Sequence, residues 1–378
     1  MKNVILAILL CLFFKMTAQV QIGQNINGEA PGDGSGLGLS LSSDGSILAI
    51  GGPNNDGAAP DNGYVRVFEN VNGAWTQIGQ DIDGAVQDDS SGSFLNLNAA
   101  GNIVAIGASQ NDDNGENSGH VRVFENVEGN WVQIGQDIDG EAQGDLSGGA
   151  LSLNNAGNIL AVGADQNDGN GTRSGHVRVF ENVEGNWVQI GQDIDGEAQG
   201  DQSGFEVVLN SSGNILAIGS IDNEDNGESS GHVRILQNVN GAWVQIGEDI
   251  AGEQEGDRSG VGLALSNSGS ILAIGGILND GNGTNSGHVR IFDLDTILSL
   301  EEITQLQFEL FPNPAADVLN IQLPQSMVLE TVNIYNNIGQ LVDTIDQGIV
   351  NTSNLSSGLY FVEVITAAGR ASQKLVIE

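Results

Sequence analysis

The chain has 378 residues, of which 49 are acidic and 11 are basic, and its formal net charge is -38. A surface this acidic repels the phosphates of nucleic acids and the headgroups of anionic membranes, so neither is an expected partner. The 55 glycines and the short, regular apolar runs predict a folded chain with many tight turns rather than a disordered one.

The N-terminus predicts a secretory signal peptide over residues 1–18. Lys2 precedes an apolar run from Val4 to Phe14 that is too short to span a bilayer, and the small residue Ala18 follows it. Removal of this segment also removes Cys11, the single cysteine, so we expect no disulfide in the exported protein. No other stretch predicts a transmembrane segment, and the expected location is extracellular or on the outer cell surface.

A long repeat follows the signal. The stretch "SGHVRVFENVEGNWVQIGQDIDGEAQGD" occurs twice, at Ser118–Asp145 and at Ser174–Asp201. Tryptophans, histidines and isoleucines recur with the same period of 56 residues, as in Trp75, Trp131, Trp187 and Trp243. The isoleucines extend the count to five copies over residues 19–298, and such a period indicates a repeat architecture.

One copy contains four predicted strands. From Ser147 these are "GALSLN", "ILAVGA", "HVRVFENV" and "WVQIGQDI", separated by turns and polar loops. Four short strands in each period favour the blade of a β-propeller, and a β-solenoid is the alternative. The continuous apolar run "ILAVGA" fits a sheet with both faces covered.

The ends of the repeat region predict a closed ring of five blades. The first copy starts on its fourth strand, Val20–Ile26, and the last copy stops after its third strand, His288–Leu294. The N-terminal strand can therefore close the last blade and leave no exposed strand edge at the joint. The predicted fold is all-β, a five-bladed β-propeller followed by a small Ig-like β-sandwich.

The repeat pattern "SG…LSL…G.ILAIGA…G.VRVF" resembles the FG-GAP repeat family of β-propeller proteins. In that family an Asp-rich turn between the first two strands binds calcium. Here the equivalent turn, Asn154–Asn158, has no carboxylate, and Asp44 in the first copy is an exception. The resemblance therefore does not carry calcium binding to this turn.

A second domain is predicted over residues 307–378, after a linker over residues 299–306. Its alternating segments suit a small β-sandwich. The domain resembles the C-terminal sorting domain of the type IX secretion system of Bacteroidota. The residues that carry this resemblance are Pro312, Asn313, Pro314, Gly339, Gly358, Tyr360 and Lys374. The resemblance implies recognition by the type IX secretion machinery, removal of the tail, and surface attachment or release.

Acidic residues recur at two loop positions in all five copies. The calcium candidates are Asp56, Asp112, Asp168, Glu224 and Asp280, in the loops between second and third strands. The other set is Asp33, Asp89, Asp145, Asp201 and Asp257, in "GDxSG" turns. Calcium favours such oxygen ligands, but aspartates also cap turns through backbone amides. Calcium is the only cofactor we consider.

The other recurrent residues have structural interpretations. His120, His176, His232 and His288 open third strands, too far from a propeller axis to share one ion. The recurrent arginines are expected to pair with carboxylates between blades. The tryptophans are expected to cover blade edges, with carbohydrate stacking as the alternative.

The sequence thus favours a secreted or surface protein that binds or adheres without catalysis, with a glycan or protein ligand. The alternatives are an exported glycan-active enzyme and a purely structural surface-layer component. No zinc motif, phosphate loop or catalytic triad order stands out, so catalytic and cofactor-binding residues are not predicted. The fourth copy departs most from the others, at Phe205–Asn210 and Ile235–Asn238, and these changes are mainly apolar.

Overall fold

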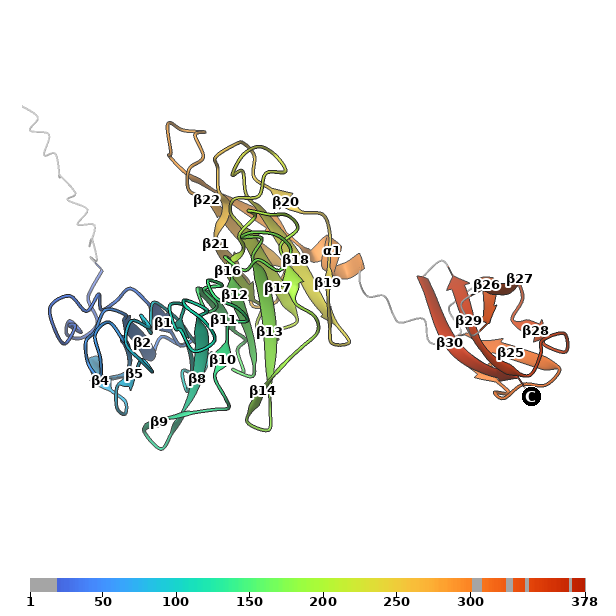
Figure 1. Cartoon of the computed structure of the whole chain (residues 1–378), viewed down its shortest axis with the longest axis horizontal. Helices are drawn as coiled ribbons and strands as arrows, with labels where there is room; N and C mark the ends of the chain where they lie inside the picture. The colour runs from blue at the N-terminus through green and yellow to red at the C-terminus, as the bar shows by residue number, and fades with distance from the viewer. Residues whose placement is uncertain (1–18, 301–307, 324–328, 337–339, 367–368, 378) are drawn as a thin grey trace, which may run out of the picture. The chain divides into compact units, whose positions relative to one another are not determined.

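The computed structural model describes residues 19–300, 308–323, 329–336, 340–366 and 369–377 (Figure 1). The predicted signal peptide, residues 1–18, and residues 301–306 of the predicted linker lie outside this part. The chain divides into two compact units, Met1–Phe292 and Asp293–Glu378. Each unit is described by itself.

Each repeat of the first unit forms one antiparallel sheet. The first sheet contains β1 (Leu39–Leu41), β2 (Ile47–Gly52), β3 (Tyr64–Val71), β4 (Ala74–Gln77) and β5 (Ile82–Asp83). The second contains β6 (Phe94–Leu97), β7 (Ile103–Ala108), β8 (His120–Val127), β9 (Asn130–Gln133) and β10 (Ile138–Asp139). The third contains β11 (Ala150–Leu153), β12 (Ile159–Ala164), β13 (His176–Val183), β14 (Asn186–Gln189) and β15 (Ile194–Asp195). The fourth contains β16 (Ser203–Leu209), β17 (Ile215–Ser220), β18 (His232–Val239), β19 (Ala242–Gln245) and β20 (Ile250–Ala251). The last contains β21 (Ser259–Leu265), β22 (Ile271–Gly276) and β23 (His288–Asp293).

The predicted fourth strand is split in two. In the third repeat, β14 and β15 both pair with β13; Ile190 N still donates to Val179 O of β13 at 2.7 Å, and residues 191–193 then interrupt the pairing. Gly191 allows this departure because its φ is +78°, a conformation that other residues rarely adopt. At this interruption Ile190 O accepts a hydrogen bond from Trp243 Nε1 of the next repeat at 3.2 Å, which connects the two repeats.

Successive sheets are joined by a backbone ladder through the turns after their first strands. Each backbone N–H in the series donates to the carbonyl 56 residues later, at 2.9 to 3.2 Å, through Ser43, Ala99, Asn155, Ser211 and Asn267. Apolar side chains fill the space between the sheets. Val65 and Val67 of the first sheet, for example, belong to one buried cluster with Leu95 and Ile106 of the second. Every residue of β12 and β17 is buried, which explains their continuous apolar runs.

The predicted closure of the last sheet by Val20–Ile26 is wrong. No strand is assigned to this segment, and the sheet β21–β22–β23 has only three strands. Instead, Ile22 O accepts from Trp75 Nε1 at 3.1 Å, and Gln24 Nε2 donates to Trp75 O at 2.6 Å. Trp131, Trp187 and Trp243 donate in the same way to the repeat before them. The N-terminal segment therefore docks on the first sheet as the end of a preceding repeat would.

The second unit begins with α1 (Asp295–Leu300), which overlaps the start of the predicted linker, and continues with two sheets. One sheet has the order β24 (Glu309–Phe311), β25 (Val318–Gln322), β28 (Ile349–Asn351). The other has the order β27 (Leu341–Ile345), β26 (Leu329–Asn336), β29 (Gly358–Thr366), β30 (Gly369–Ile377). Both sheets contribute to one buried core that includes Leu319, Ile334, Val362 and Leu375. An Ig-like strand topology stays a prediction. Among the described residues, no helix has the length and apolar character to cross a membrane.

Candidate functional site: histidine–carboxylate clusters on the acidic edge

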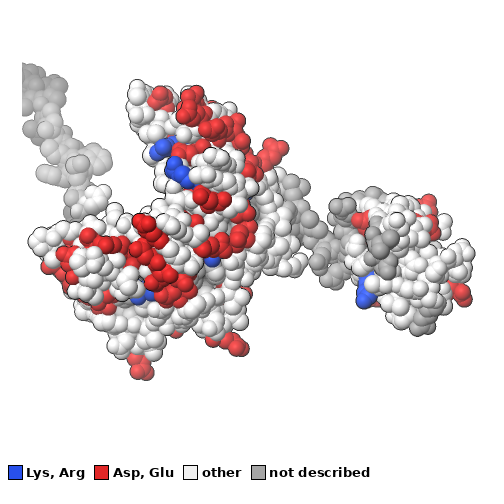
Figure 2. Space-filling model, viewed as in Figure 1, with Lys and Arg blue, Asp and Glu red and all other residues white. Residues whose placement is uncertain are grey.

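Two kinds of long loop meet along one edge of the sheets. The loop after the second strand bonds to the loop that leads to the next repeat, as in Ser91 N to Asn62 O at 3.2 Å and Ser147 N to Ser118 O at 3.0 Å. These loops, together with the last residues of β5, β10 and β15, hold 26 of the 49 acidic residues. Figure 2 shows acidic side chains gathered in patches along the array. We call this surface the acidic edge. It favours cations and positively charged partners.

The aspartates of the "GDxSG" turns are buried turn caps. Asp33, Asp89, Asp145, Asp201 and Asp257 are at most 4% exposed. In the third repeat, Asp145 Oδ2 accepts from Ala142 N at 2.9 Å and from Asn167 Nδ2 at 3.0 Å. This carboxylate thus fastens its own turn to the neighbouring long loop.

Most of the calcium candidates also cap turns. Oδ1 of Asp56, Asp112, Asp168 and Asp280 accepts from the backbone N–H five residues later, at 2.7 to 3.1 Å. The donor residues have φ between 46° and 54°, so each bond supports a left-handed turn position. Within the described residues, none of the three clusters of possible metal ligands contains these candidates or Glu224. Calcium binding by them stays a prediction.

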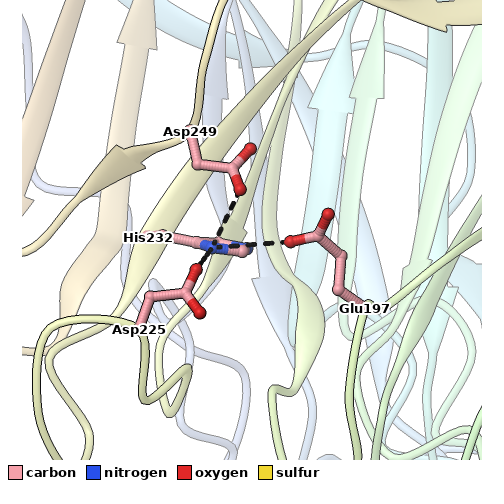
Figure 3. Close-up of side chains that lie close together, drawn as sticks. All are labelled: Glu197, Asp225, His232 and Asp249. Atoms are coloured by element: carbon pink, nitrogen blue, oxygen red, sulfur yellow. Dashed lines mark ion pairs between the residues drawn. The ribbon is translucent and has the colours of Figure 1, made fainter.

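The largest cluster of possible metal ligands surrounds His232, the first residue of β18 (Figure 3). Its Nδ1 lies 3.5 Å from Asp225 Oδ2, 3.9 Å from Glu197 Oε2 and 4.0 Å from Asp249 Oδ2. The imidazole is 0% exposed, and neither ring nitrogen has a hydrogen-bond partner. Three carboxylates therefore face one buried nitrogen.

Neighbouring amides position these carboxylates. Gln245 Nε2 donates to Asp249 Oδ1 at 2.6 Å, which leaves Oδ2 directed at the imidazole. The Asp225 backbone N–H donates to Asn223 Oδ1 at 3.0 Å. Glu197 comes from the loop after β15, so the cluster joins the fourth repeat to the connection that precedes it.

The same positions in other repeats carry incomplete sets. His120 has Asp113 and Asp137 beside it, and Ala85 stands where the fourth repeat has its glutamate. His176 has Glu141 and Asp193, and Gly169 stands where the fourth repeat has Asp225. In the last repeat, His288 Nδ1 lies 3.6 Å from Glu253, but Gly281 stands where the fourth repeat has Asp225, and the described sheet has no fourth strand to supply the other aspartate.

Sequence reasoning placed the histidines but missed the carboxylates around them. The glutamates of "GE", such as Glu141, Glu197 and Glu253, and the aspartates of "DI", such as Asp137, Asp193 and Asp249, recur with the repeat period, and this was the available signal. Periodicity alone does not show that these glutamates, these aspartates and the loop after the second strand face one imidazole. The aspartate comes close to the histidine only because the fourth strand is split in two.

Burial dominates the electrostatics of the clusters. It lowers the pKa of His120 and His176, and neighbouring carboxylates oppose it only in part. Burial also raises the pKa of Glu197, and the charge of Asp249 adds to this effect. Arg234 opposes the rise; its Nη2 donates to Asp195 O at 2.7 Å.

The other recurrent residues connect neighbouring repeats. All five arginines donate to a backbone carbonyl 39 residues earlier, namely Arg66, Arg122, Arg178, Arg234 and Arg290. Ion pairs to Glu29 and Glu141 accompany this bond at Arg66 and Arg178. Trp131, Trp187 and Trp243 are at most 4% exposed, which leaves no open ring face for carbohydrate stacking.

The second unit holds its N-terminal motif against its last strand. Asn313, between Pro312 and Pro314, donates through Nδ2 to Lys374 O at 2.8 Å and accepts through Oδ1 from Val376 N at 2.9 Å. Residues 309–378 match the secretion system C-terminal sorting domain. The match confirms the predicted sorting domain, which implies export by type IX secretion and a location on the cell surface or outside the cell.

The remaining residues predicted for the sorting motif lie in or near the last two strands. Gly358 and Tyr360 begin β29, and Lys374 lies in β30. Tyr360 OH donates to Ser356 O at 2.9 Å. Gly339 lies outside the described residues.

Other comparisons give only distant likenesses. No curated protein matches the sequence. Hydrazine synthase of Kuenenia stuttgartiensis is similar with a TM-score of 0.47 and 15% identity, over 70% of this chain and 66% of that one. A putative 6-phosphogluconolactonase of Bacteroides uniformis has a TM-score of 0.45 and 11% identity, over 91% and 86%. The periplasmic gluconolactonase PpgL of Pseudomonas aeruginosa has a TM-score of 0.42 and 12% identity, over 90% and 85%. The FG-GAP resemblance and the absence of catalysis stay predictions.

Proposed function

We propose that this protein is a non-catalytic binding or adhesion protein that acts outside the cell after type IX export. The observation that carries the proposal is the repetition of one edge: successive repeats present the same capped aspartates and acidic loops. A catalytic site needs different groups that converge on one substrate, whereas equal surfaces in series suit multivalent binding. The acidic edge favours a protein ligand with a basic surface, or a glycan bound together with cations.

Arrays of glycans and of basic and acidic peptides test this proposal. The mature chain should retain glycans only with added divalent cations, or basic peptides in preference to acidic ones, and binding should weaken as salt rises. The same glycans should be recovered uncut. Release of shorter sugars would instead support the exported glycan-active enzyme, and failure to bind any probe would contradict a binding role.

A structural role in a surface layer has its own support, because both ends of the array expose apolar faces. Leu39 and Leu41 of the first sheet are 60% and 57% exposed, and Val289 and Ile291 of the last are 66% and 72% exposed. Their counterparts at the joint between the first two sheets, Leu95, Leu97, Val65 and Val67, are buried in one cluster. The exposed face of the first sheet is therefore equivalent to one side of the internal joint, and the exposed face of the last sheet is equivalent to the other side.

We propose that a second copy covers these faces, head to tail, by repeating the internal joint. Such a contact between unlike faces continues into a chain of subunits unless the rotation closes it. The double variant Leu39→Cys, Ile291→Cys tests it, because the only native cysteine is Cys11 in the predicted signal. Disulfide-linked oligomers are expected.

The other outcomes contradict the surface-layer role. A disulfide within one chain would show that the array closes on itself as the five-bladed ring, and an absence of disulfide would show that the faces do not meet. The pair Val71→Cys, Val127→Cys is the control, since these side chains are 45% and 47% exposed but lie away from the two end faces.

A further inference from the structure

We propose that His232, Glu197, Asp225 and Asp249 bind one divalent transition-metal ion of the zinc class. Their four ligand atoms lie within 4.8 Å of one another. The separations from His232 Nδ1, 3.5 to 4.0 Å, are long for hydrogen bonds. Around four-coordinate zinc, with bonds of about 2.0–2.2 Å, neighbouring ligand atoms are about 3.4 Å apart. Small inward rotations of the carboxylates bring the group to that geometry.

The buried imidazole is an independent reason to expect a ligand. Both nitrogens of His232 lack hydrogen bonds although the side chain is 0% exposed, and buried polar atoms without partners are costly. The ring nonetheless points into the cluster (Figure 3). A cation between the imidazole and the carboxylates would satisfy the nitrogen and relieve the repulsion among the three anions.

The donor set selects the class of ion. Calcium and magnesium prefer sites made entirely of oxygen, whereas a neutral imidazole nitrogen suits zinc and similar ions. The three carboxylates exclude a preference for soft ions such as copper(I). The bonds from Gln245 Nε2 to Asp249 and from the Asp225 backbone N–H to Asn223 Oδ1 are outer contacts of the kind that orient metal ligands.

The other repeats show which ligand each incomplete site lacks. Gly169 replaces the loop aspartate beside His176, and Ala85 replaces the glutamate beside His120. The loop around Gly169 has the same hydrogen bond, because Gly169 N donates to Asn167 Oδ1 as Asp225 N donates to Asn223 Oδ1. A Cβ added at Gly169 would lie 2.8 Å from Asn167 Oδ1, so the end of that side chain must shift to admit an aspartate. The chain therefore offers substitutions that remove the complete site or create another one, each with a natural precedent in a neighbouring repeat.

Calorimetric titration of the metal-free mature chain with Zn²⁺ tests the site. One tight equivalent is expected, and Co²⁺ should give the visible absorption of a four-coordinate site. Asp225→Gly should weaken the tight site by about tenfold or more, as loss of a ligand requires. Glycine already occupies this position at residues 57, 169 and 281, so the variant should fold. Glu228→Gln changes a carboxylate in the same loop outside the cluster and should leave the affinity unchanged.

Two gain-of-ligand variants complete the test. Gly169→Asp and Ala85→Glu should each add a second tight equivalent of Zn²⁺. Several weak, equal equivalents that respond alike to Asp225→Gly and Glu228→Gln would overturn the proposal, because the ions would then be a diffuse atmosphere on the acidic edge. An absence of Zn²⁺ binding would also overturn it.

Discussion

Glu206 lies in β16, the first strand of the fourth repeat, at a position where no other repeat has a carboxyl group. The equivalent residues of the other repeats are uncharged, namely Gly38, Phe94, Ala150 and Gly262. Burial raises the pKa of Glu206 to about 7. The ordinary value of 4.5 applies to the unfolded chain, so between pH 4.5 and about 7 the native state retains a proton that the unfolded chain releases. The free energy of unfolding must therefore fall as pH rises through this window.

Glu206→Gln should remove this pH dependence. The parent should lose at most about 3 kcal/mol of stability across the window, with no further loss from this group above it. Urea unfolding at the two ends of the window measures the difference. Glu228→Gln, which removes a carboxyl group from a loop, is the control and should keep the parent's slope. If Glu206→Gln also keeps that slope, Glu206 is not buried as described.

The buried aspartate caps should contribute more stability than the exposed ones. Asp145→Ala leaves Asn167 Nδ2 and the turn amide without their acceptor in a buried place, at a cost of about 1–3 kcal/mol. Asp112→Ala removes one exposed bond and should cost about 0.5–1 kcal/mol. Denaturant midpoints of the two variants give the comparison. Equal losses of stability in the two variants would show that the burial of Asp145 does not increase the contribution of its hydrogen bonds to stability.

These residues also show where sequence reasoning reached its limit. Both acidic positions could be placed in loops, and turn capping was a recognised alternative for them. Their different burial could not be predicted, because Asp145 is covered by the neighbouring long loop through Asn167. The cluster around His232 was missed for a similar reason: its members are separated in sequence and meet only when a loop from the preceding repeat folds over β18.

Among the elements, the strands themselves were largely predictable and their docking was not. Alternation and turn residues identified the four strand segments of each repeat. The fourth strand was expected to be continuous, but Gly191 and its equivalents turn the chain out toward the next tryptophan. The N-terminal segment has an isoleucine and a glutamine, Ile22 and Gln24, at the positions that contact the next tryptophan in other repeats. The sequence pattern therefore allowed this segment to dock on the first sheet as well as on the last.

Deletion of residues 20–26 should therefore affect the first sheet. Trp75 loses the acceptor of its indole N–H and the bonds from Gln24. We expect faster hydrogen exchange in β3 and β4, with unchanged exchange in β21–β23. Gln24→Ala alone should show a smaller effect in the same strands. Increased exchange in β23 would instead support closure of the last sheet by this segment.

At the scale of the molecule, the period of 56 residues gave the number of repeated sheets, and motif order gave the sorting domain. The period did not establish a closed ring. Equivalent repeats make the same contacts with their neighbours whether the array is open at its ends or closed on itself. Export and the proposed binding are thus assigned to different units: the acidic edge lies in the first, and the sorting domain lies in the second.

The export function should depend on the fold of the sorting domain through Asn313. Asn313→Ala removes both bonds that tie the "PNP" turn to β30 and should cost the second unit about 1–3 kcal/mol. A destabilised tail is degraded or passed over before the secretion machinery binds it, so less protein should reach the surface of a host with type IX secretion. Asn320→Ala, which removes one exposed bond to Phe311 O, is the control and should be exported like the parent.

Fractionation of cells measures surface and periplasmic protein. Undiminished surface display after deletion of residues 309–378 would contradict the assignment of export to this unit, whereas loss of display with Asn313→Ala and not with Asn320→Ala would place recognition in the folded tail.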